Sequence, residues 1–342
     1  MRFLRRLSAT LLIAALPLMS GSANAETYEL KVSHFLPPNH TINKELLRWA
    51  DELKQKSGGR LVLSVFPASQ MGPLPRQYDL ARTGVADISF FLHGATPGRF
   101  KLTEVAQLPF TFWKGNEPVS NSQGSYEVSQ LIPEFAKEHQ GVHILYMLAL
   151  TTGGLYFNKA TVRTPADLKG LRIRHNGPLA AATLKAWGAT PVAVLPAEVP
   201  DAMQKGTIDG VVFNYEVSES FKMASVVKTV TEIMPTAATF ALVMNNDSYN
   251  KLPADLRKLI DDTTGPEAAK RVGALYDAAN AHGKAYMLKG GVTVTPVTPA
   301  AYKQFDDLVA PVTNEWIKKL DSEGLPAKKI HDELRAMTNK AP

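Results

Sequence analysis

The sequence predicts an α/β protein in two lobes, in which mixed sheets are flanked by helices. Patterns typical of strands and helices alternate between residues 28 and 92, and the same alternation starts again between residues 164 and 213. The chain of 342 residues contains no cysteine, so a disulfide framework and a cysteine nucleophile are excluded and stability must come from an ordinary core. Its length is sufficient for two lobes.

Residues 1–25 have the pattern of a secretory signal peptide. Three arginines within the first six residues precede the apolar run Leu7–Met19, and Ala23-Asn24-Ala25 forms an A-x-A cleavage site before Glu26. The apolar run is shorter than the ~20 residues that a spanning helix needs, although an uncleaved anchor is the alternative. We expect a mature protein that starts at Glu26, works in the periplasm and has no stable membrane insertion after cleavage.

The charge balance bears on the partners. The formal net charge of +6 falls to +3 when residues 1–25 are removed, because that segment holds three arginines and no acidic residue. So small an excess does not predict a nucleic-acid binder, but it favours the approach of a small anion.

The first part of the chain follows strand and helix patterns closely. Polar and apolar residues alternate over 28–33, and Pro37-Pro38-Asn39 then breaks the strand. Thr41 is the expected N-cap of an amphipathic helix that Gly58-Gly59 ends. The expected elements are strands at 28–33, 61–66 and 86–92, and helices between Thr41 and Gly58 and over 73–83.

The second unit begins after a strand expected at 143–150. Thr164-Pro165-Ala166-Asp167 combines a hydroxyl cap, a proline at the first helical position and an acid in the first turn, which predicts a helix start. Gly170 ends that helix, and Asn176-Gly177-Pro178 turns the chain into a helix that stops at Gly188. The other expected elements are strands at 171–175, 192–195 and 208–213 and a helix at 199–205.

The last part of the chain contains a long alanine-rich helix, expected over 266–289. At 1.5 Å per residue it is roughly 35 Å long, enough to cross from one lobe to the other. Strands are expected at 239–245 and 292–297, and helices at 252–263 and 305–320. Because no flexible linker separates the lobes, the chain must cross between them several times. We expect 26–151 with 240–279 in lobe I, 152–239 with 280–325 in lobe II, and 326–342 as a C-terminal segment.

Signatures of catalysis are missing from the sequence. It contains no G-x-S-x-G, no phosphate loop, no G-x-G-x-x-G and no H-E-x-x-H. His139 and His143 are four residues apart, but Gly141 lies between them, so we expect surface histidines rather than metal ligands. The sequence therefore predicts no enzyme, no metal and no cofactor. A triad built from distant residues stays open as the alternative.

Arg174 is the most informative candidate for binding. Over 171–175, Leu171 and Ile173 alternate with Arg172 and Arg174, so the two arginines share one face of the strand. Arg174 stands at the carboxyl end of that strand, which borders the ligand crevice in open α/β sheets. There its guanidinium can hold a carboxylate by two parallel hydrogen bonds. The alternative is that both arginines are solvated surface residues.

Several spaced motifs resemble one family. They are D-L-K-G-L-R-I-R at 167–174, L-K-A-W-G-A-T-P at 184–191 and G-T-I-D-G-V-V-F-N at 206–214, with S-G-G-R at 57–60, G-V-A-D-I at 84–88 and L-P-F at 108–110 upstream. In this order they resemble the substrate-binding proteins of tripartite ATP-independent periplasmic (TRAP) transporters, the DctP-like family. The resemblance extends over nearly the whole mature chain.

The resemblance implies a periplasmic-binding-protein-like fold that closes around a small organic acid, with a long helix spanning both lobes. It also implies a small and a large permease subunit as partners, and we expect a monomer. By the same resemblance Arg174 is the carboxylate anchor and Asn214 a second ligand contact. Many members have an arginine where this chain reads Thr152-Gly153-Gly154-Leu155-Tyr156, so a second carboxylate clamp is in doubt.

One clamp suggests one carboxylate, because each ionised group in a closed cleft needs donors. Aromatic residues and histidines near the expected strand ends favour an aromatic or hydrophobic monocarboxylate, with a small hydroxy- or oxo-acid next. The candidate contacts are His34, Phe35, Phe91, His93, Gly94, Leu155, His175, Phe213, Tyr215 and Phe240. Two other functions stay open: an exported enzyme acting on such acids, with His93 or His34 as base, and a receptor for a sensor system.

Overall fold

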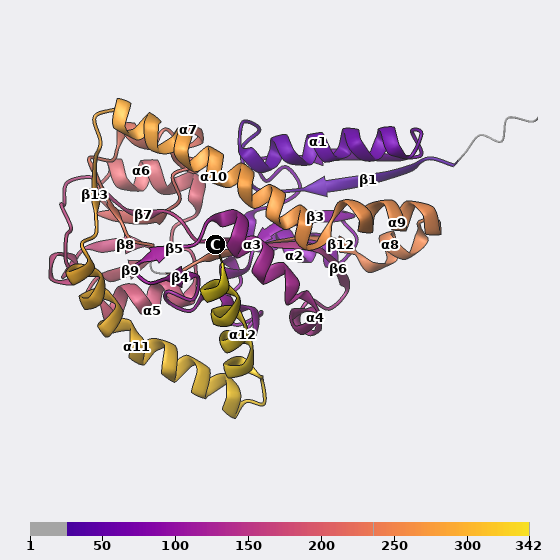
Figure 1. Cartoon of the computed structure of the whole chain (residues 1–342). Helices are drawn as coiled ribbons and strands as arrows, with labels where there is room; N and C mark the ends of the chain where they lie inside the picture. Colours follow the sequence, from indigo (N-terminus) through magenta and orange to yellow (C-terminus); the bar gives the residue numbers. More distant parts are fainter. Residues whose placement is uncertain (1–25, 235, 342) are drawn as a thin grey trace, which may run out of the picture.

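The computed structural model describes residues 26–234 and 236–341 and has an α/β architecture built on two main sheets (Figure 1). The expected signal peptide, residues 1–25, lies outside the described residues. Within the described ranges, no helix is long and apolar enough to cross a membrane.

The first sheet has the strand order β2-β1-β3-β12-β6. Its central strand β3 is buried along its whole length and pairs parallel to β1 and antiparallel to β12, which comes from far along the chain. The sheet is therefore mixed, as expected. Its strands are β1 (Tyr28–Ser33), β2 (Leu61–Phe66), β3 (Ile88–Leu92), β6 (Val142–Leu150) and β12 (Ala238–Asn245), and its helices include α1 (Thr41–Lys56), α2 (Gln77–Arg82) and α3 (Asn121–Gln130).

The second sheet has the order β13-β11-β7-β10-β8-β9 and is also mixed, because β7 runs antiparallel to both of its neighbours. Strand β8, which carries Arg174, pairs parallel with β10 and β9. Its strands are β7 (Gly154–Phe157), β8 (Arg172–Arg174), β9 (Thr190–Val192), β10 (Gly210–Phe213), β11 (Thr229–Glu232) and β13 (Thr293–Pro296), with helices α5 (Pro178–Ala186), α6 (Val199–Gln204) and α7 (Val217–Ser220) nearby.

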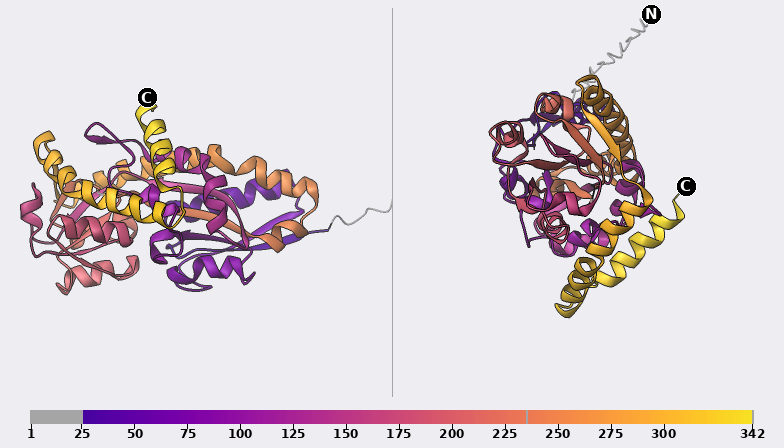
Figure 2. Two further views of the ribbon diagram at one scale, coloured as in Figure 1. Left: turned by 90° about the horizontal axis from the view of Figure 1, so that it is seen from below. Right: turned by 90° about the vertical axis from the view of Figure 1, so that its left-hand side faces the viewer.

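Short elements and C-terminal helices complete the fold. The C-terminal helices lie on one side of the molecule (Figure 2), where Trp187 of the second unit donates to the Phe305 carbonyl and Thr338 donates to Glu127 of the first. The remaining elements are η1 (Leu74–Arg76), η2 (His93–Ala95), η3 (Thr103–Gln107), β4 (Trp113–Lys114), β5 (Glu117–Pro118), α4 (Ile132–Phe135), η4 (Ala136–Glu138), η5 (Pro165–Leu168), η6 (Pro196–Glu198), η7 (Met223–Ser225), α8 (Asn246–Lys251), α9 (Ala254–Thr263), α11 (Pro299–Ser322) and α12 (Ala327–Lys340).

Helix α10 (Gly265–Lys289) runs along both units (Figure 1). Two of its glycines allow close backbone contact at separate places. A Cβ on Gly273 would lie 2.5 Å from the Asn121 carbonyl oxygen of α3, and a Cβ on Gly283 would lie 2.0 Å from the Tyr215 carbonyl oxygen behind β10. The long spanning helix is confirmed, and its interior glycines are required by packing rather than by turns.

Most expected elements occur, with shifted ends. The helix expected from Thr164 is only the short η5, because Lys169 leaves the helical region and Gly170 has φ +79°. The strand expected at 192–195 is instead Thr190–Val192. The final long helix starts at Pro299 rather than 305, because the Thr298 side chain caps it. The sequence analysis assigned no element to α3, β7, β11 or α12.

The contact between α10 and α3 yields a stability prediction. Gly273→Ala should lower the free energy of unfolding by about 1–3 kcal/mol, because the new methyl group meets backbone atoms of Asn121 and Ser122. Alanine gains about 1 kcal/mol of helix propensity over glycine, so a net loss isolates the packing effect. Urea unfolding without ligand measures it.

The exposed neighbour Ala274 supplies the control. Ala274→Gly should cost only the propensity difference of about 1 kcal/mol. If Gly273→Ala instead stabilises the protein, the close approach of the two helices is not a packing constraint.

Candidate functional site

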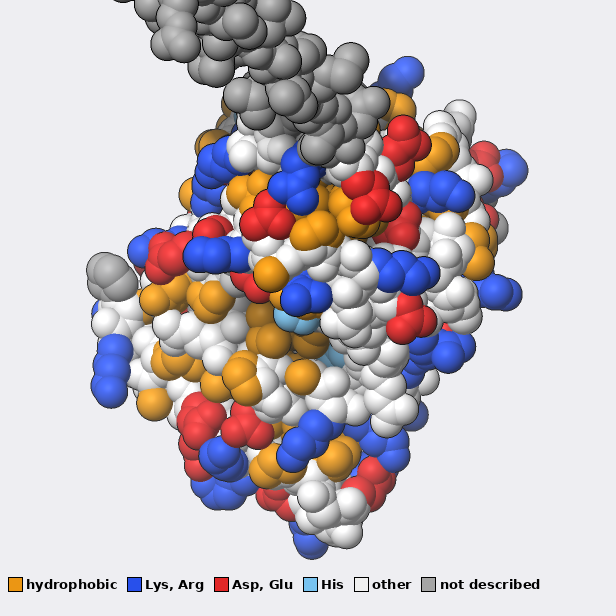
Figure 3. All heavy atoms as spheres, turned by 90° about the vertical axis from the view of Figure 1, so that its right-hand side faces the viewer, with side chains coloured by type: hydrophobic (Ala, Val, Ile, Leu, Met, Phe, Trp, Pro, Cys, Tyr) orange, Lys and Arg blue, Asp and Glu red, His pale blue; other side chains and the backbone are white. Residues whose placement is uncertain are grey.

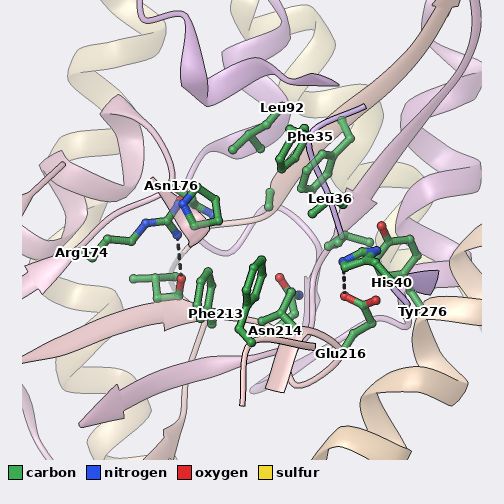
Figure 4. A pocket seen from close by; sticks show the side chains of 17 residues that line it. Phe35, Leu36, His40, Leu92, Arg174, Asn176, Phe213, Asn214, Glu216 and Tyr276 are labelled. Carbon is green, nitrogen blue, oxygen red and sulfur yellow. Dashed lines mark hydrogen bonds and ion pairs between the residues drawn. The ribbon is translucent and has the colours of Figure 1, made fainter. Parts of the chain in front are cut away.

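An internal cavity lies where elements of both sheets meet (Figure 4). We call it the inner cavity, and it encloses about 520 Å³ of space not filled by protein atoms, which includes space open to solvent. Residues from both sheets line it, so it depends on their relative position. They include Phe35, Leu36, His40, Leu92 and Phe240 from the first unit, Arg174, Asn176, Phe213, Asn214 and Glu216 from the second, and Tyr276 of α10.

Arg174 supplies the positive charge of the inner cavity. The residue is 3% exposed, and its guanidinium donates to the carbonyls of Val194 and Val212 and lies 5.0 Å from the centre of the Phe213 ring. Burial lowers the pKa of Arg174 to about 10, which leaves the group charged at neutral pH. Across the described residues no acidic side chain forms an ion pair with it. Arg172, two residues earlier on the same strand, pairs with Asp209 at the surface, but Arg174 is buried, so the alternative of two surface arginines is wrong for Arg174.

Aromatic rings form the walls next to this charge. Phe213 stacks with Phe221 at 6.1 Å between ring centres, and Phe240 stacks on Phe90, which in turn stacks with Phe35. Phe35, Phe213 and Phe240 were expected near a ligand, and all line the inner cavity. A flat apolar ligand therefore finds matching surfaces.

The end of the cavity away from Arg174 holds Glu216 and His40 (Figure 4). Glu216 Oε2 lies 2.9 Å from His40 Nε2, and both side chains are 2% exposed. The Thr41 N–H donates to Glu216 Oε1 at 3.3 Å. Burial alone would raise the pKa of the Glu216 carboxyl, but the interactions with His40 and Thr41 outweigh it and leave that pKa below its ordinary value.

Asn214 also lines the cavity, as expected, but its amide is already engaged. Its Nδ2 donates to the Thr152 carbonyl, and that part of the chain is held by Asn280 of α10, whose Nδ2 donates to the Thr152 hydroxyl at 2.7 Å. Asn280 Oδ1 accepts from the Glu216 N–H at 2.7 Å. The long helix thus holds both Thr152 and Glu216 in place.

A second space, the outer cavity, adjoins the first through Arg174, Asn176, Leu92 and Pro196. Gly94 and His175, both expected as ligand contacts, line this outer cavity instead of the inner one. Burial, and then the Arg174 charge, lower the pKa of His175 below its ordinary value, so its ring is neutral at neutral pH.

Five expected contacts line neither cavity. His34 bonds to Asn43 at 3.0 Å inside the first unit, and burial lowers its pKa to about 4. Leu155 and Tyr215 are buried within the second unit, and the Tyr215 hydroxyl donates to Glu232. The other two are Phe91 and His93, which are buried against each other in the first unit.

His93 begins η2 directly after β3 and packs against Phe91, outside the inner cavity. Its Nε2 lies 3.0 Å from His139 Nε2 in a buried cluster with Phe91 and Phe100. The expectation that His139 is a surface residue is therefore wrong, and Phe91 is core rather than ligand contact. Burial lowers the pKa of both imidazoles, to about 4 in His139. Within the described ranges, no three ligating side chains come together to hold a metal ion.

The inner cavity is also lined by residues that were not predicted from the sequence, namely His40, Glu216, Phe221 and Tyr276. A signal existed for Glu216, which follows Asn214 by two residues at the end of a strand. None existed for His40 or Tyr276, since each reaches the cavity only through tertiary packing.

The outer surface, unlike the inner cavity, carries many charged side chains of both signs. On the face in Figure 3, Lys and Arg side chains are interspersed with Asp and Glu side chains. That face carries no patch of one sign such as nucleic-acid binders use.

Comparisons with known proteins agree on one family. Residues 32–319 match the family described as bacterial extracellular solute-binding protein, family 7. Over 341 residues the chain is 28% identical to an outer membrane transporter protein, TsaT, of Comamonas testosteroni, with 98% of each chain covered.

Two crystal structures are similar in fold and sequence. A TRAP solute-binding protein from Rhodoferax ferrireducens T118, in complex with copurified benzoate, has a TM-score of 0.86 and 30% identity, covering 92% of this chain and 98% of that one. A TRAP solute-binding protein from a marine metagenome, specific for aromatic acid ligands and co-crystallised with 3-hydroxybenzoate, has a TM-score of 0.86 and 26% identity, covering 92% and 99%. The predicted two-lobed fold is thereby confirmed.

The contact between Gly94 and the 176–177 turn yields a prediction about closure. A Cβ on Gly94 would lie 2.1 Å from the Asn176 carbonyl oxygen and 2.9 Å from Gly177 Cα. Gly94→Ala should therefore hold the two units apart and weaken ligand binding by about tenfold or more, equal to at least about 1.4 kcal/mol. Titration calorimetry measures the affinity, and small-angle scattering with ligand should show a more open particle.

Thermal unfolding without ligand is the control for this variant. It should change little, because the clash arises only where the two units meet. An unchanged affinity would show that this close approach is not part of the bound state.

Proposed function

The chain belongs to family 7 of the bacterial extracellular solute-binding proteins, and from this membership we propose that it captures an aromatic monocarboxylate and delivers it to a membrane permease. Membership and the likeness to TRAP solute-binding proteins make it a TRAP solute-binding receptor for a small organic acid. What we propose is the identity of that acid, the residues that bind it and the permease subunits that receive it.

The observation that carries the proposal is the buried charge of Arg174. A desolvated guanidinium is costly unless an opposite charge is paired with it, and no described acidic side chain pairs with this one. A ligand carboxylate can accept two parallel hydrogen bonds from the planar guanidinium. Arg174 is therefore the carboxylate anchor, and Asn214 is the secondary contact.

The walls of the inner cavity favour an aromatic ligand. Phe35, Phe213 and Phe240 present ring surfaces, and Arg174 is the one arginine or lysine that lines the inner cavity in the described chain. One cation and several rings suit one carboxylate on a flat apolar body. The solved relatives in complex with benzoate and with 3-hydroxybenzoate support this ligand class.

Capture works by closure, because the lining comes from both lobes. An open form exposes half of the site on each lobe, and a ligand that contacts both favours the closed form. We assign 26–151 with 240–279 to lobe I and 152–239 with 280–325 to lobe II. The closed monomer then meets the small and large permease subunits in the periplasm, after export by the signal peptide of residues 1–25. A receptor for a sensor system would share this mechanism.

An exported enzyme is the competing proposal, and the site argues against it. His34 and His93, the candidate bases, line neither cavity. A ligand recovered chemically unchanged after long incubation, as judged by mass spectrometry, supports the receptor function, and conversion of the ligand would overturn it.

A ligand screen with one substitution tests the proposal. Benzoate and hydroxybenzoates should raise the melting temperature, whereas dicarboxylates and sugar acids should not. Arg174→Ala should weaken benzoate binding by about 2–5 kcal/mol, because the carboxylate loses its charged partner in a dry site. Arg174→Lys should also weaken it, since lysine keeps the charge but loses the planar fork. Calorimetry measures both.

Arg172→Ala is the matched control, because Arg172 lies on the same strand and pairs with Asp209 outside the cavity. It should leave affinity unchanged. Stabilisation by dicarboxylates or sugar acids alone, or an unchanged affinity in Arg174→Ala, would overturn the proposal.

A further inference from the structure

The inner cavity has a second charged end, whose purpose the anchoring of a carboxylate does not explain. Glu216 lies behind β10 at the end away from Arg174 (Figure 4), and its side chain is 2% exposed. His40 and the Thr41 N–H of the first unit stabilise this carboxylate, but its charge still repels a ligand carboxylate at this end.

The acceptor capacity of Glu216 is only partly used. Oε1 accepts from the Thr41 N–H. Oε2 lies 2.9 Å from His40 Nε2 and is paired with it, although this contact falls outside hydrogen-bond geometry. An ionised carboxylate has about four acceptor positions, and leaving them empty in a buried place costs free energy. An incoming donor can recover that cost.

The His40 ring is not free to rotate and donate a better-aligned hydrogen bond to Oε2. Its Nδ1 accepts from the Ile42 N–H at 3.2 Å and so caps α1. This hydrogen bond assigns the ring proton to Nε2 and fixes the plane of the ring. The ring therefore stays beside Oε2 as its partner, and other acceptor positions of the carboxylate stay open.

We propose that Glu216 is a specificity-determining residue, which accepts a hydrogen bond from a hydroxyl group on the ring of an aromatic monocarboxylate while Arg174 holds its carboxylate. This inference rests on the proposed function and deepens it from aromatic acids in general to ring-hydroxylated ones. The ring then lies between the two ends, against Phe213 and the side chains opposite it.

The same carboxylate rejects other acids. A second carboxylate at this end would meet Glu216 in a low-dielectric site, where like charges repel strongly. A methoxy group in place of the hydroxyl has no hydrogen to donate, so it cannot form a hydrogen bond to Glu216. Selection thus combines one attractive contact with one repulsive contact.

Calorimetry on the unmodified protein is the first test, since it needs no variant. The 3- or 4-hydroxybenzoate should bind at least about tenfold more tightly than benzoate and than its own methoxy analogue, because a hydrogen bond to a charged acceptor is strong when desolvated. Benzene dicarboxylates should bind more weakly than benzoate. Equal affinity for hydroxylated and unsubstituted acids, or preference for a dicarboxylate, would overturn the inference.

Glu216→Gln is the second test. It should reduce the preference for the hydroxylated acid over benzoate by about tenfold, because a neutral amide is a weaker acceptor than a carboxylate. Glu219→Gln is the matched control, because Glu219 is exposed and pairs only with His282 at the surface, and it should leave the preference intact. A preference that survives Glu216→Gln would overturn the assignment.

Two further outcomes distinguish a failure of the proposed function from a failure of the hydroxyl assignment. If neither benzoate nor any hydroxybenzoate binds the unmodified protein, the proposed function itself fails. If benzoate binds through Arg174 but aminobenzoates are preferred over hydroxybenzoates, the hydroxyl assignment is overturned and the proposed function stands.

Discussion

The buried guanidinium of Arg174 is the constraint on which the rest of the site depends. Its N–H groups donate to Val194 and Val212, and its face lies near the Phe213 ring. These contacts satisfy dipoles, but they do not neutralise a full charge in a low-dielectric place. Since residues of both lobes line the cavity beside Arg174, an anion bound there favours closure.

Helix α10 connects the site to both units of the fold. It contacts the first unit through Gly273 and the second through Gly283, and Asn280 binds both Thr152 and the Glu216 backbone. A residue with a Cβ at either glycine would push the helix off its neighbour. The far end of the cavity is consequently held by an element that belongs to neither sheet.

The fold was largely predictable from the sequence, and the site only in part. Local signals, such as the alternation over 28–33 and the 176–178 turn, fix elements through neighbouring residues, and they also placed Arg174 correctly at a strand end. Contacts set by tertiary packing gave no local signal. His34 and His93 stand near strand ends like true contacts, but His93 lies against His139, and His34 bonds to Asn43. Tyr276 and His40 reach the cavity from distant segments, which periodicity does not bring together.

The opposite charges at the two ends of the inner cavity also determine how a ligand lies in it. An aromatic acid entering with its carboxylate toward Glu216 would place two anions together, and in a buried site such a juxtaposition costs several kcal/mol. In the other orientation the carboxylate meets Arg174 and the rings of both lobes cover the ligand body. The cavity therefore has charged groups at its two ends and aromatic rings along its walls. Under the proposed function, that arrangement favours the pose with the carboxylate at Arg174, and the same two charges would select the ligand.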